Sequence, residues 1–486
     1  MHTAMPAFDH ITFHAQELTE IVSGMLFRSS DRPISGLCTD SRTVQPDNMF
    51  IALRGENMDG HKFIDNAVEN GCSCVITEQV LLPAGDVSVI VVKNTLYALG
   101  AIAAWYRQQM QTKVVAVTGS VGKTTTKQYV WSVLRQRYQT LKTEGNYNNE
   151  IGVPLTLLGL TEKTELSVLE MGMNHKGEMS RLSAIARPDI AMITNIGTSH
   201  IENLGSRNGI CDAKLEITDG MPLGAPLILN ADEELLMAKA HEIKARGVVP
   251  VTVSKEDPIS DYFISDISVT SSGGTFSLTR AKDGTVYRDI QISQPGEHNI
   301  LNAAMAWVVG ELCHMTPEEI RRGLLSFENT GMRQNIYELS GYCIIEDCYN
   351  ASPESMEASL KVLHAVAAER GARAVAVLGD MLELGSFTRS LHERVGKAVT
   401  ENNVQLLLTF GRLGTHIAQG SLHYGLRPEQ VYENADLTEP QATAQTLLSL
   451  CRPGDVILFK ASRAVRMERV IEAFRDLVCI SPTQSV

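Results

Sequence analysis

Short apolar runs alternate with amphipathic stretches through the middle of this chain. The apolar runs lie at residues 113–118, 166–170, 190–195 and 226–230, and a loop follows each of them. Near-continuous apolar strands that alternate with helices are typical of parallel sheets covered on both faces. The pattern predicts an α/β fold with a central, doubly wound and mostly parallel sheet.

Between about residues 261 and 293 the apolar positions recur with a period of two. Gly273-Gly274 and Asp283-Gly284 interrupt this alternation. Alternation with glycine-containing breaks indicates antiparallel hairpins. We therefore expect hairpins added to the parallel sheet, followed by a helix at residues 298–315 and a second helix that begins near Pro317.

Further α/β units flank the central sheet on both sides. The N-terminal part predicts strands at residues 75–77 and 89–92 with a helix near 61–70, and a helix at 95–110 then leads into the central sheet. Beyond a boundary near residues 331–335 come four more apolar strands that alternate with helices, at 342–346, 374–378, 405–410 and 456–459.

The length of the chain sets the number of domains. At roughly 150 residues per domain, 486 residues suggest three domains. We expect a small α/β N-terminal domain at residues 1–95, the central domain at 96–333, and a Rossmann-like α/β C-terminal domain at 334–486.

Composition excludes several classes of protein. The chain has 43 Lys and Arg against 56 Asp and Glu, a net charge of −13, without the basic stripe by which proteins hold nucleic acid. No apolar run approaches the roughly 20 residues of a membrane span. Residues 1–14 lack the pattern of a signal peptide. We expect a cytoplasmic, monomeric protein with no membrane insertion.

The nine cysteines are scattered along the chain and odd in number, which argues against a disulfide framework. Cys72 and Cys74 form a C-x-C pair, but no second pair lies at the spacing of a zinc site. We interpret these two residues as reduced thiols in the core.

The strongest local motif is the phosphate loop, residues 118–124, with the sequence Thr-Gly-Ser-Val-Gly-Lys-Thr between an apolar strand and a helix. Glycines let backbone N–H groups surround an anion at a helix N-terminus. Lys123 would reach the β- and γ-phosphates, and the Thr124 hydroxyl would bind Mg²⁺. The general motif places Gly where this chain has Val117, so on the motif alone an ordinary strand-to-helix turn remains an alternative.

Metal ligands are expected near this loop. Glu170 ends a neighbouring apolar strand, as the carboxylate of a phosphate-loop metal site should, although a surface glutamate is the alternative. His200 follows the strand at 190–195 and could bind a second metal or be an ordinary loop histidine. Lys214 alone suggests an exposed helix residue, because an ammonium cannot bind a metal.

Several ordered motifs resemble the Mur ligases, a family of ATP-dependent, amide-forming enzymes of peptidoglycan synthesis. The family's phosphate loop has the shorter form T-G-x-x-G-K-[S/T], which accommodates Val117. The resemblance covers nearly the whole chain. Its motifs lie at residues 39–42, 50–55, 59–61, 145–154, 170–175, 298–303, 347–356 and 378–385, with His392 downstream.

The two last motifs indicate which member of the family the chain is most similar to. They imply an enzyme that attaches D-Ala-D-Ala to a UDP-N-acetylmuramoyl-tripeptide, with a role in cell-wall biogenesis, cell shape and cell division. The Asp-Asn-Pro-Arg motif of the diaminopimelate-adding sibling does not occur. A sibling amide ligase, such as a folylpolyglutamate synthetase, and a phosphate-loop ATPase or kinase are the alternatives.

The resemblance also implies the chemistry. The terminal carboxylate of the tripeptide attacks the γ-phosphate of ATP, and the amine of the dipeptide then attacks the resulting acyl phosphate. In this family the lysine that matches Lys214 is carbamylated by CO₂. Two Mg²⁺ ions are then implied, one at Thr124 and Glu170 and one at the carbamate and His200. The implied catalytic residues are Lys123, His200 and Lys214.

Binding roles follow from the same motifs. The first domain would bind the UDP end, the central domain ATP, and the third domain both nucleotide and dipeptide, with a hinge near Arg333 and Gln334. For Lys460 and Arg463 a basic pair at a helix start is the alternative. The implied ATP-binding residues are Thr118, Gly119, Ser120, Val121, Gly122, Lys123, Thr124, Thr125, Asn149, Asn299, Asn302, Arg333 and Asp347. The implied substrate-binding residues are Ser41, Arg42, Asn174, His175, Tyr349, Asn350, Lys460 and Arg463.

Overall fold

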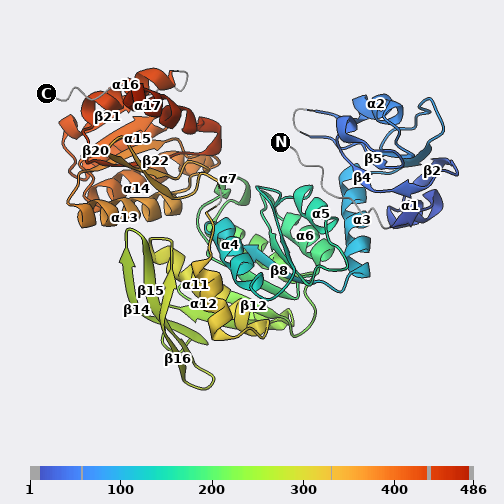
Figure 1. Ribbon diagram of the computed structural model, residues 1–486, viewed down its shortest axis with the longest axis horizontal. Helices are drawn as coiled ribbons and strands as arrows, with labels where there is room; N and C mark the ends of the chain where they lie inside the picture. Colours follow the sequence, from blue (N-terminus) through green and yellow to red (C-terminus); the bar gives the residue numbers. More distant parts are fainter. Residues whose placement is uncertain (1–10, 56–57, 330, 435–438, 481–486) are drawn as a thin grey trace.

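The computed structural model describes residues 11–55, 58–329, 331–434 and 439–480. It contains three main sheets, of five, nine and six strands, in chain order. In Figure 1 the first and third sheets lie on opposite sides of the central one. The predicted α/β class and mostly parallel central sheet are confirmed. The exact domain boundaries after residues 95 and 333 remain predictions, and the first ten residues of the segment 1–14 lie outside the described part.

The first sheet has the strand order β2-β7-β6-β5-β4, with β2 alone antiparallel to its neighbour. Its strands are β2 (Met25–Arg28), β4 (Leu37–Cys38), β5 (Met49–Ile51), β6 (Cys74–Thr77) and β7 (Ser88–Val91). A separate pair joins β1 (Thr12–Phe13) to β3 (Ile34–Ser35). The helices are α1 (Ala15–Ile21), η1 (Ser41–Thr43), η2 (Gly60–Phe63), α2 (Ile64–Glu69) and α3 (Thr95–Gln109). The strands of two to four residues before β6 are too short to show a period, and the sequence did not predict them.

The cysteines of this region lie in its core. Cys72 and Cys74 are fully buried, and burial raises the pKa of the Cys72 thiol to about 12. Such thiols are poor nucleophiles and poor metal ligands at neutral pH. Of the chain's nine free cysteines, eight are buried and Cys479 is exposed.

The central sheet has the order β16-β15-β14-β13-β12-β11-β8-β10-β9 and is parallel from β9 to β14. Its parallel strands are β8 (Lys113–Thr118), β9 (Thr140–Lys142), β10 (Leu166–Glu170), β11 (Ile190–Ile193), β12 (Pro226–Asn230) and β13 (Val249–Ser254). β11 ends two residues earlier than the pattern predicts, which leaves Thr194 and Asn195 beyond the strand. β9 and β13 were not predicted.

The predicted hairpins are formed by β14 (Tyr262–Thr270), β15 (Gly273–Arg280) and β16 (Thr285–Ile292), with β15 antiparallel to both of its neighbours. Gly273 and Gly274 begin β15, so the preceding turn lies at Ser271 and Ser272, not at the two glycines. A Cβ on Gly273 would lie 2.2 Å from the carbonyl oxygen of Ile292, so the close neighbouring strand requires glycine there.

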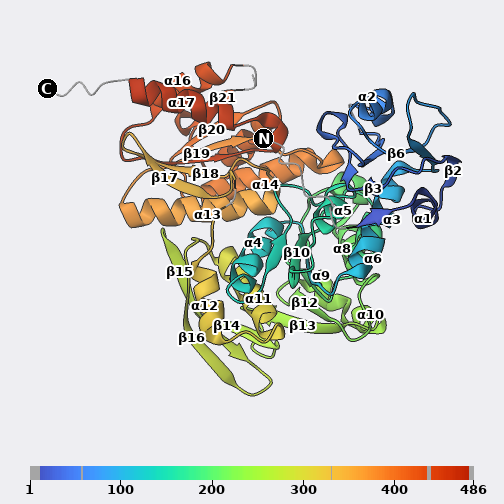
Figure 2. The same ribbon diagram turned by 45° about the vertical axis from the view of Figure 1, so that its right-hand side comes forward.

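Helices cover both faces of the central sheet, as Figure 2 shows. α4 and α11 pack together with fully buried Tyr129 and Trp307 in one core. The helices are α4 (Lys123–Leu134), α5 (Gly152–Leu157), α6 (Glu178–Ala186), α7 (Ile201–Leu204), α8 (Arg207–Leu215), η3 (Glu216–Thr218), α9 (Glu234–Ala238), α10 (Ala240–Ala245), α11 (Glu297–Leu312) and α12 (Pro317–Leu325).

The third sheet has the order β17-β18-β22-β19-β20-β21, parallel except for edge strand β17. Its strands are β17 (Asn335–Leu339), β18 (Tyr342–Glu346), β19 (Ala374–Gly379), β20 (Leu406–Phe410), β21 (Val431–Asn434) and β22 (Val456–Lys460). Its helices are α13 (Pro353–Arg370), η4 (Gly385–Phe387), α14 (Thr388–Glu401), α15 (Gly414–His423), η5 (Pro428–Gln430), α16 (Pro440–Leu450), η6 (Arg463–Val465) and α17 (Glu468–Ile480). In the described part of the chain, no helix is long and apolar enough to cross a membrane.

Candidate active site

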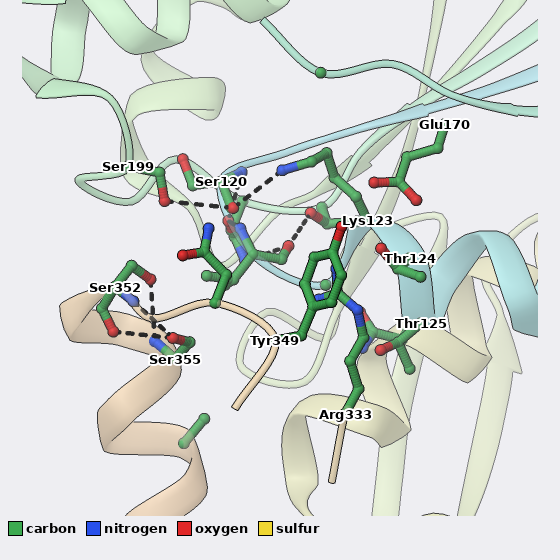
Figure 3. Close-up of a pocket in the computed structure, with 18 of the residues that line it drawn as sticks. Ser120, Lys123, Thr124, Thr125, Glu170, Ser199, Arg333, Tyr349, Ser352 and Ser355 are labelled. Carbon is green, nitrogen blue, oxygen red and sulfur yellow. Dashed lines mark hydrogen bonds between the residues drawn. The ribbon is translucent and has the colours of Figure 1, made fainter. Parts of the chain in front are cut away.

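One cavity of about 420 Å³ lies between the central and third sheets. Both sheets are mostly parallel, so the carboxyl ends of their strands lie along one edge of each sheet. Ligands of such folds bind at that edge. Figure 3 shows the phosphate loop on one side of this cavity, with Arg333 and Tyr349 on another. The predicted residues that line it are Ser120, Val121, Gly122, Lys123, Thr124, Thr125, Asn149, Glu170, Asn174, His200, Asn299, Asn302, Arg333, Asp347, Tyr349, Asn350 and Lys460.

The phosphate loop connects β8 to α4, and Gly122 caps the helix with φ +84°. A Cβ on Gly119, whose φ is +150°, would lie 1.8 Å from Thr194 Oγ1. Two glycines are therefore required, one for the backbone conformation and one for close approach of β11. Lys123 Nζ donates to the carbonyl oxygens of Gly119 (2.9 Å) and Ser120 (3.2 Å). Burial lowers the pKa of Lys123, although the Glu170 carboxylate opposes this effect.

Thr194 and Asn195, which the sequence reasoning missed, lie against this loop. Asn195 Oδ1 accepts from the N–H groups of Ser120 (3.1 Å) and Val121 (3.0 Å). Thr194 Oγ1 donates to the carbonyl oxygen of Val121 (2.6 Å). The signal for these contacts was the position of both residues just past a strand that runs beside β8.

Glu170 ends β10 on the other side of β8 and is 2% exposed. Asn148 Nδ2 donates to its Oε1 at 2.8 Å, and Lys127 Nζ lies 3.5 Å from its Oε2. Oε2 accepts no hydrogen bond from any residue in the described ranges. Burial alone would raise the pKa of Glu170, but Lys127, Lys123 and Arg333 outweigh it and hold the pKa below its usual value. The carboxylate is thus charged, with one oxygen available to a cation.

Lys214 lies on α8 and is 3% exposed, so the expectation of an exposed helix residue is wrong. Burial, together with the charge of Lys123, lowers the pKa of Lys214 well below its usual value. Lys214 is not among the residues that line the cavity in the described part of the chain. A buried amine of this kind is neutral more often than an exposed one and hence more reactive toward electrophiles.

His200 is the N-cap residue of α7 and has a left-handed backbone conformation (φ +61°). Its Nδ1 lies 2.5 Å from Glu383 Oε2, between β19 and η4. Nearby, Thr198 Oγ1 donates to the two carboxylate oxygens of Glu354 at 3.0 and 3.1 Å. The loop that carries His200 therefore directly contacts the third region, which is the part of the chain that forms the third sheet and its helices.

Asn299 and Asn302 lie on one face of α11, as their spacing of three predicts. Asn302 Nδ2 donates to Asn299 Oδ1 (3.3 Å), and Thr126 Oγ1 donates to Asn302 Oδ1 (3.0 Å). Asn299 Nδ2 also donates to Gln334 Oε1 at 3.1 Å. The pair is thereby fixed between the start of α4 and the connection to the third sheet.

Asp347 and Lys460 lie at the carboxyl ends of neighbouring strands β18 and β22. Lys460 Nζ donates to Asp347 Oδ2 at 2.6 Å, and Ser359 Oγ donates to the same oxygen at 2.6 Å. Burial alone would raise the pKa of Asp347, but Lys460, Ser359 and Arg333 hold it below its usual value. Lys460 ends a strand, so the alternative of a basic pair at a helix start is wrong for it.

Arg333 and Tyr349 stack, with the guanidinium carbon 4.1 Å from the ring centroid. Both face the cavity in Figure 3. A guanidinium over an aromatic ring keeps its in-plane N–H groups free for anions.

Some predicted residues are not brought into this cavity. Ser41 and Arg42 lie in η1 of the first region, where Arg42 pairs with Asp40 at 2.6 Å. Arg463 begins η6 and pairs with Glu468 at 3.0 Å. His175 is largely exposed and pairs with Glu178 at 2.9 Å. Thr118 and Gly119 lie in the loop but not among the described lining residues.

Comparison with known proteins matches all three regions to one family. The Mur ligase family catalytic domain matches residues 33–107, the Mur ligase middle domain residues 117–310, and the Mur ligase glutamate ligase domain residues 332–463.

Two relatives that match over nearly their whole length carry the same name. The UDP-N-acetylmuramoyl-tripeptide–D-alanyl-D-alanine ligase of Bacillus subtilis is 38% identical over 468 residues, which cover 95% of this chain and 98% of the relative. That of Escherichia coli is 34% identical, with 96% and 99% coverage.

Comparison with solved structures points to the same family. MurF from Acinetobacter baumannii has a TM-score of 0.85 at 30% identity and covers 96% of this chain and 99% of its own. MurF ligase from Thermotoga maritima in complex with ADP has a TM-score of 0.79 at 29% identity, with 91% and 97% coverage. A folylpolyglutamate synthase from Mycobacterium tuberculosis shares the fold at 15% identity, with 80% and 95% coverage and a TM-score of 0.61. Because relatives of more than 30% identity match nearly their whole length, and each of the three regions matches its own family domain, this chain belongs to the Mur ligase family.

Proposed function

We propose that this protein is an ATP-dependent ligase that joins D-Ala-D-Ala to a UDP-N-acetylmuramoyl-tripeptide, producing the UDP-linked pentapeptide, ADP and phosphate. One observation carries the proposal: a single cavity joins the phosphate loop to the Asp347–Lys460 pair of another sheet. The names of the full-length relatives from Bacillus subtilis and Escherichia coli support the choice of substrates.

The charges of the cavity suit a nucleotide triphosphate. Lys123 and Arg333 line it beside the backbone of the phosphate loop, and Lys460 lies deeper with Asp347. Cations and fixed N–H groups stabilise phosphoryl oxygens better in such a site than water does, because they need no reorganisation. In our assignment Asn299 and Asn302 read the adenine and Asp347 the ribose.

The reaction begins with the terminal carboxylate of the tripeptide. It attacks the γ-phosphorus, the bond to the β–γ bridging oxygen breaks, and ADP leaves with that electron pair. The amine of D-Ala-D-Ala then attacks the acyl phosphate carbonyl, loses a proton, and expels inorganic phosphate. A carboxylate is a poor electrophile, so phosphorylation supplies the leaving group, and the protein contributes mainly positioning and charge neutralisation. Lys123 would hold the γ-phosphate for the first step.

The residues present fit the implied Mg²⁺ ions. Glu170 is charged with Oε2 free of hydrogen bonds from the described residues, and Thr124 lines the same cavity. In our assignment these two residues hold one ion, and His200 with a carbamate on Lys214 holds a second. The described residues contain no cluster of three His, Cys, Asp or Glu that could hold a metal, so an added carbamate would supply a ligand that the side chains lack. Bound Mg²⁺ would neutralise the charge between attacking carboxylate and phosphate.

The remaining site assignments belong to the same proposal. Residues 1–95 would bind the UDP end through Ser41 and Arg42, and Asn174 and His175 would face the muramoyl-peptide. Residues 334–486 would contact the dipeptide. The same assignment implies a cytoplasmic monomer that acts in peptidoglycan synthesis.

Product analysis tests the function. The purified protein should be incubated with ATP, Mg²⁺, a UDP-N-acetylmuramoyl-tripeptide and one amine at a time: D-Ala-D-Ala, diaminopimelate, lysine or glutamate. We expect a mass increase of the UDP-peptide with D-Ala-D-Ala alone, and ADP release that requires the amine. A product with another amine would assign a sibling reaction, and ADP release without any amine would indicate an ATPase.

Lys214 gives a second test. Lys214→Ala should abolish turnover while thermal unfolding stays cooperative, with Lys244→Ala on the exposed side of α10 as the matched control. Removal of CO₂ and bicarbonate should lower the wild-type rate, and their return should restore it. A Lys214→Ala protein of normal rate would contradict the carbamate.

A further inference from the structure

Asn195 uses its side chain to bind two N–H groups of the phosphate loop, those of Ser120 and Val121, which line the cavity. The N–H of Val121 donates to Asn195 Oδ1 at 3.0 Å. The N–H of Ser120 is shared between Asn195 Oδ1 and the main-chain oxygen of Asn195, both at 3.1 Å. Asn195 Nδ2 donates back to the carbonyl oxygen of Val121 at 3.2 Å. The carboxamide therefore accepts from and donates to one residue of the loop, Val121.

These N–H groups are the ones that a phosphate loop presents to a nucleotide. A loop of this kind binds anions by turning successive backbone N–H groups toward one point. Val121 and Asn195 both line the cavity, so their contact lies where a ligand of the loop would bind. An amide oxygen and a phosphate oxygen cannot both accept the same short hydrogen bond from Val121.

The segment that carries Asn195 continues directly to the third region. Ser199 Oγ donates to the carbonyl oxygen of Ser120 at 3.4 Å, and Thr198 Oγ1 donates to Glu354 on α13. Residues 194–199 thus contact both the phosphate loop and the third region. A movement of Asn195 would therefore be transmitted to the contact of Thr198 with Glu354, which joins the central region to the third region.

We propose that the carboxamide of Asn195 is an internal competitor of the nucleotide, which holds the N–H of Val121 until a phosphate oxygen displaces it. Asn195 is a positioning residue in this role, because it acts through the N–H groups of the loop and makes no bond to the reacting atoms. The inference rests on the proposed nucleotide site and adds the step by which that site is filled.

Nucleotide binding to three proteins tests this inference. Isothermal titration with MgADP should show that Asn195→Ala binds about fivefold more tightly than the wild type, because an intramolecular hydrogen bond no longer has to be broken. Asn195→Asp should bind at least tenfold more weakly, since a carboxylate holds the N–H groups more strongly and repels phosphate. If Asn195→Ala does not fold, Asn195→Ser, whose side chain is too short to reach Val121, replaces it.

Thr194→Val is the matched control. It removes the hydrogen bond from Thr194 Oγ1 to the carbonyl oxygen of Val121 but leaves the N–H groups with Asn195. This variant should not bind MgADP more tightly than the wild type. Hydrogen exchange adds a readout on the free protein, because the Val121 amide should exchange faster in Asn195→Ala and regain protection with MgADP.

The outcomes separate the inference from the proposed function. Equal or weaker binding of MgADP by Asn195→Ala would overturn the competitor role and make Asn195 a scaffold residue. A wild-type protein that binds no MgADP would overturn the nucleotide site itself.

Discussion

The ammonium of Lys460 lies 2.6 Å from the carboxylate of Asp347, at the ends of two adjacent parallel strands of the third sheet. The Lys460 side chain is buried and that of Asp347 is partly buried, with exposures of 3% and 16%. A buried ion pair of this kind gains its Coulomb energy at the cost of desolvating two charges. The cost to stability is therefore expected when one partner is removed and the other charge is left alone.

Loss of either partner should destabilise the protein. Lys460→Met leaves Asp347 buried without its principal cation, and Asp347→Asn leaves Lys460 without its anion, so each should lower the free energy of unfolding by about 3 kcal/mol. The double variant should recover part of that loss. Urea unfolding measures all three, and additive losses in the double variant would contradict a direct pair.

Asp347 should also contribute more to ATP binding than to tripeptide binding. In our assignment it contacts the ribose, so Asp347→Ala should weaken ATP binding more than tripeptide binding, as measured by isothermal titration. Equal losses for the two ligands would argue against the ribose assignment.

Gly119→Ala should abolish nucleotide binding. Its added Cβ would lie 1.8 Å from Thr194 Oγ1, and its φ of +150° disfavours any side chain. The loop must shift to relieve this contact, so MgADP affinity should fall by more than a hundredfold. Gly145→Ala is the control for the cost of left-handed backbone, because its φ is +51° and nothing lies within 4 Å of its added Cβ. Equal effects of the two substitutions would exclude the close approach as the cause.

His392 makes stability depend on pH. Its Nδ1 donates to the carbonyl oxygen of Thr388 at 2.7 Å, which leaves Nε2 to accept from the N–H of Met381 at 3.0 Å. Burial lowers the pKa of His392 to about 4 from the 6.5 of an exposed histidine. Between these values the unfolded chain binds the proton and the folded protein does not.

The stability from this histidine is therefore complete above pH 6.5 and is lost as the pH falls toward 4. The difference corresponds to about 3 kcal/mol. His392→Gln should flatten the pH dependence of the free energy of unfolding in this range, whereas the exposed His175→Gln should leave it steep. A wild-type protein with no decline between pH 6.5 and 4 would contradict the buried neutral imidazole.

Glu354 should control the arrangement of the central and third regions. It accepts from Thr198 across the boundary, and Arg394 Nη1 lies 3.6 Å from it on its own side. Glu354→Ala should widen the distribution of radii of gyration in small-angle scattering, because one of the contacts between the regions is lost. Glu357→Ala, which removes a partner of Arg394 within the third region, is the control. ATP analogue and tripeptide together should compact the wild type, and an unchanged scattering curve would argue against the hinge.

The sequence by itself determined the class of fold and much of the candidate site. The strands β8, β10, β12 and β18 have the predicted bounds, because fully buried parallel strands need unbroken apolar runs. The phosphate loop was visible because its glycines, lysine and threonine are neighbours in the chain. The short strands β4 and β9 escaped prediction, since they are stabilised by their neighbours in the sheet and carry no period of their own.

Tertiary structure decided what distant residues do. Lys214 looked like an exposed helix residue until packing buried it. The sequence marked Asn195 only as the end of an apolar run, and the placement of β11 beside β8 brings its amide to Val121. Lys460 contacts Asp347, which lies 113 positions away in the chain, because β22 and β18 end side by side. Local sequence records periodicity and turn chemistry, whereas desolvation and charge pairing depend on neighbours that the chain supplies only when it folds.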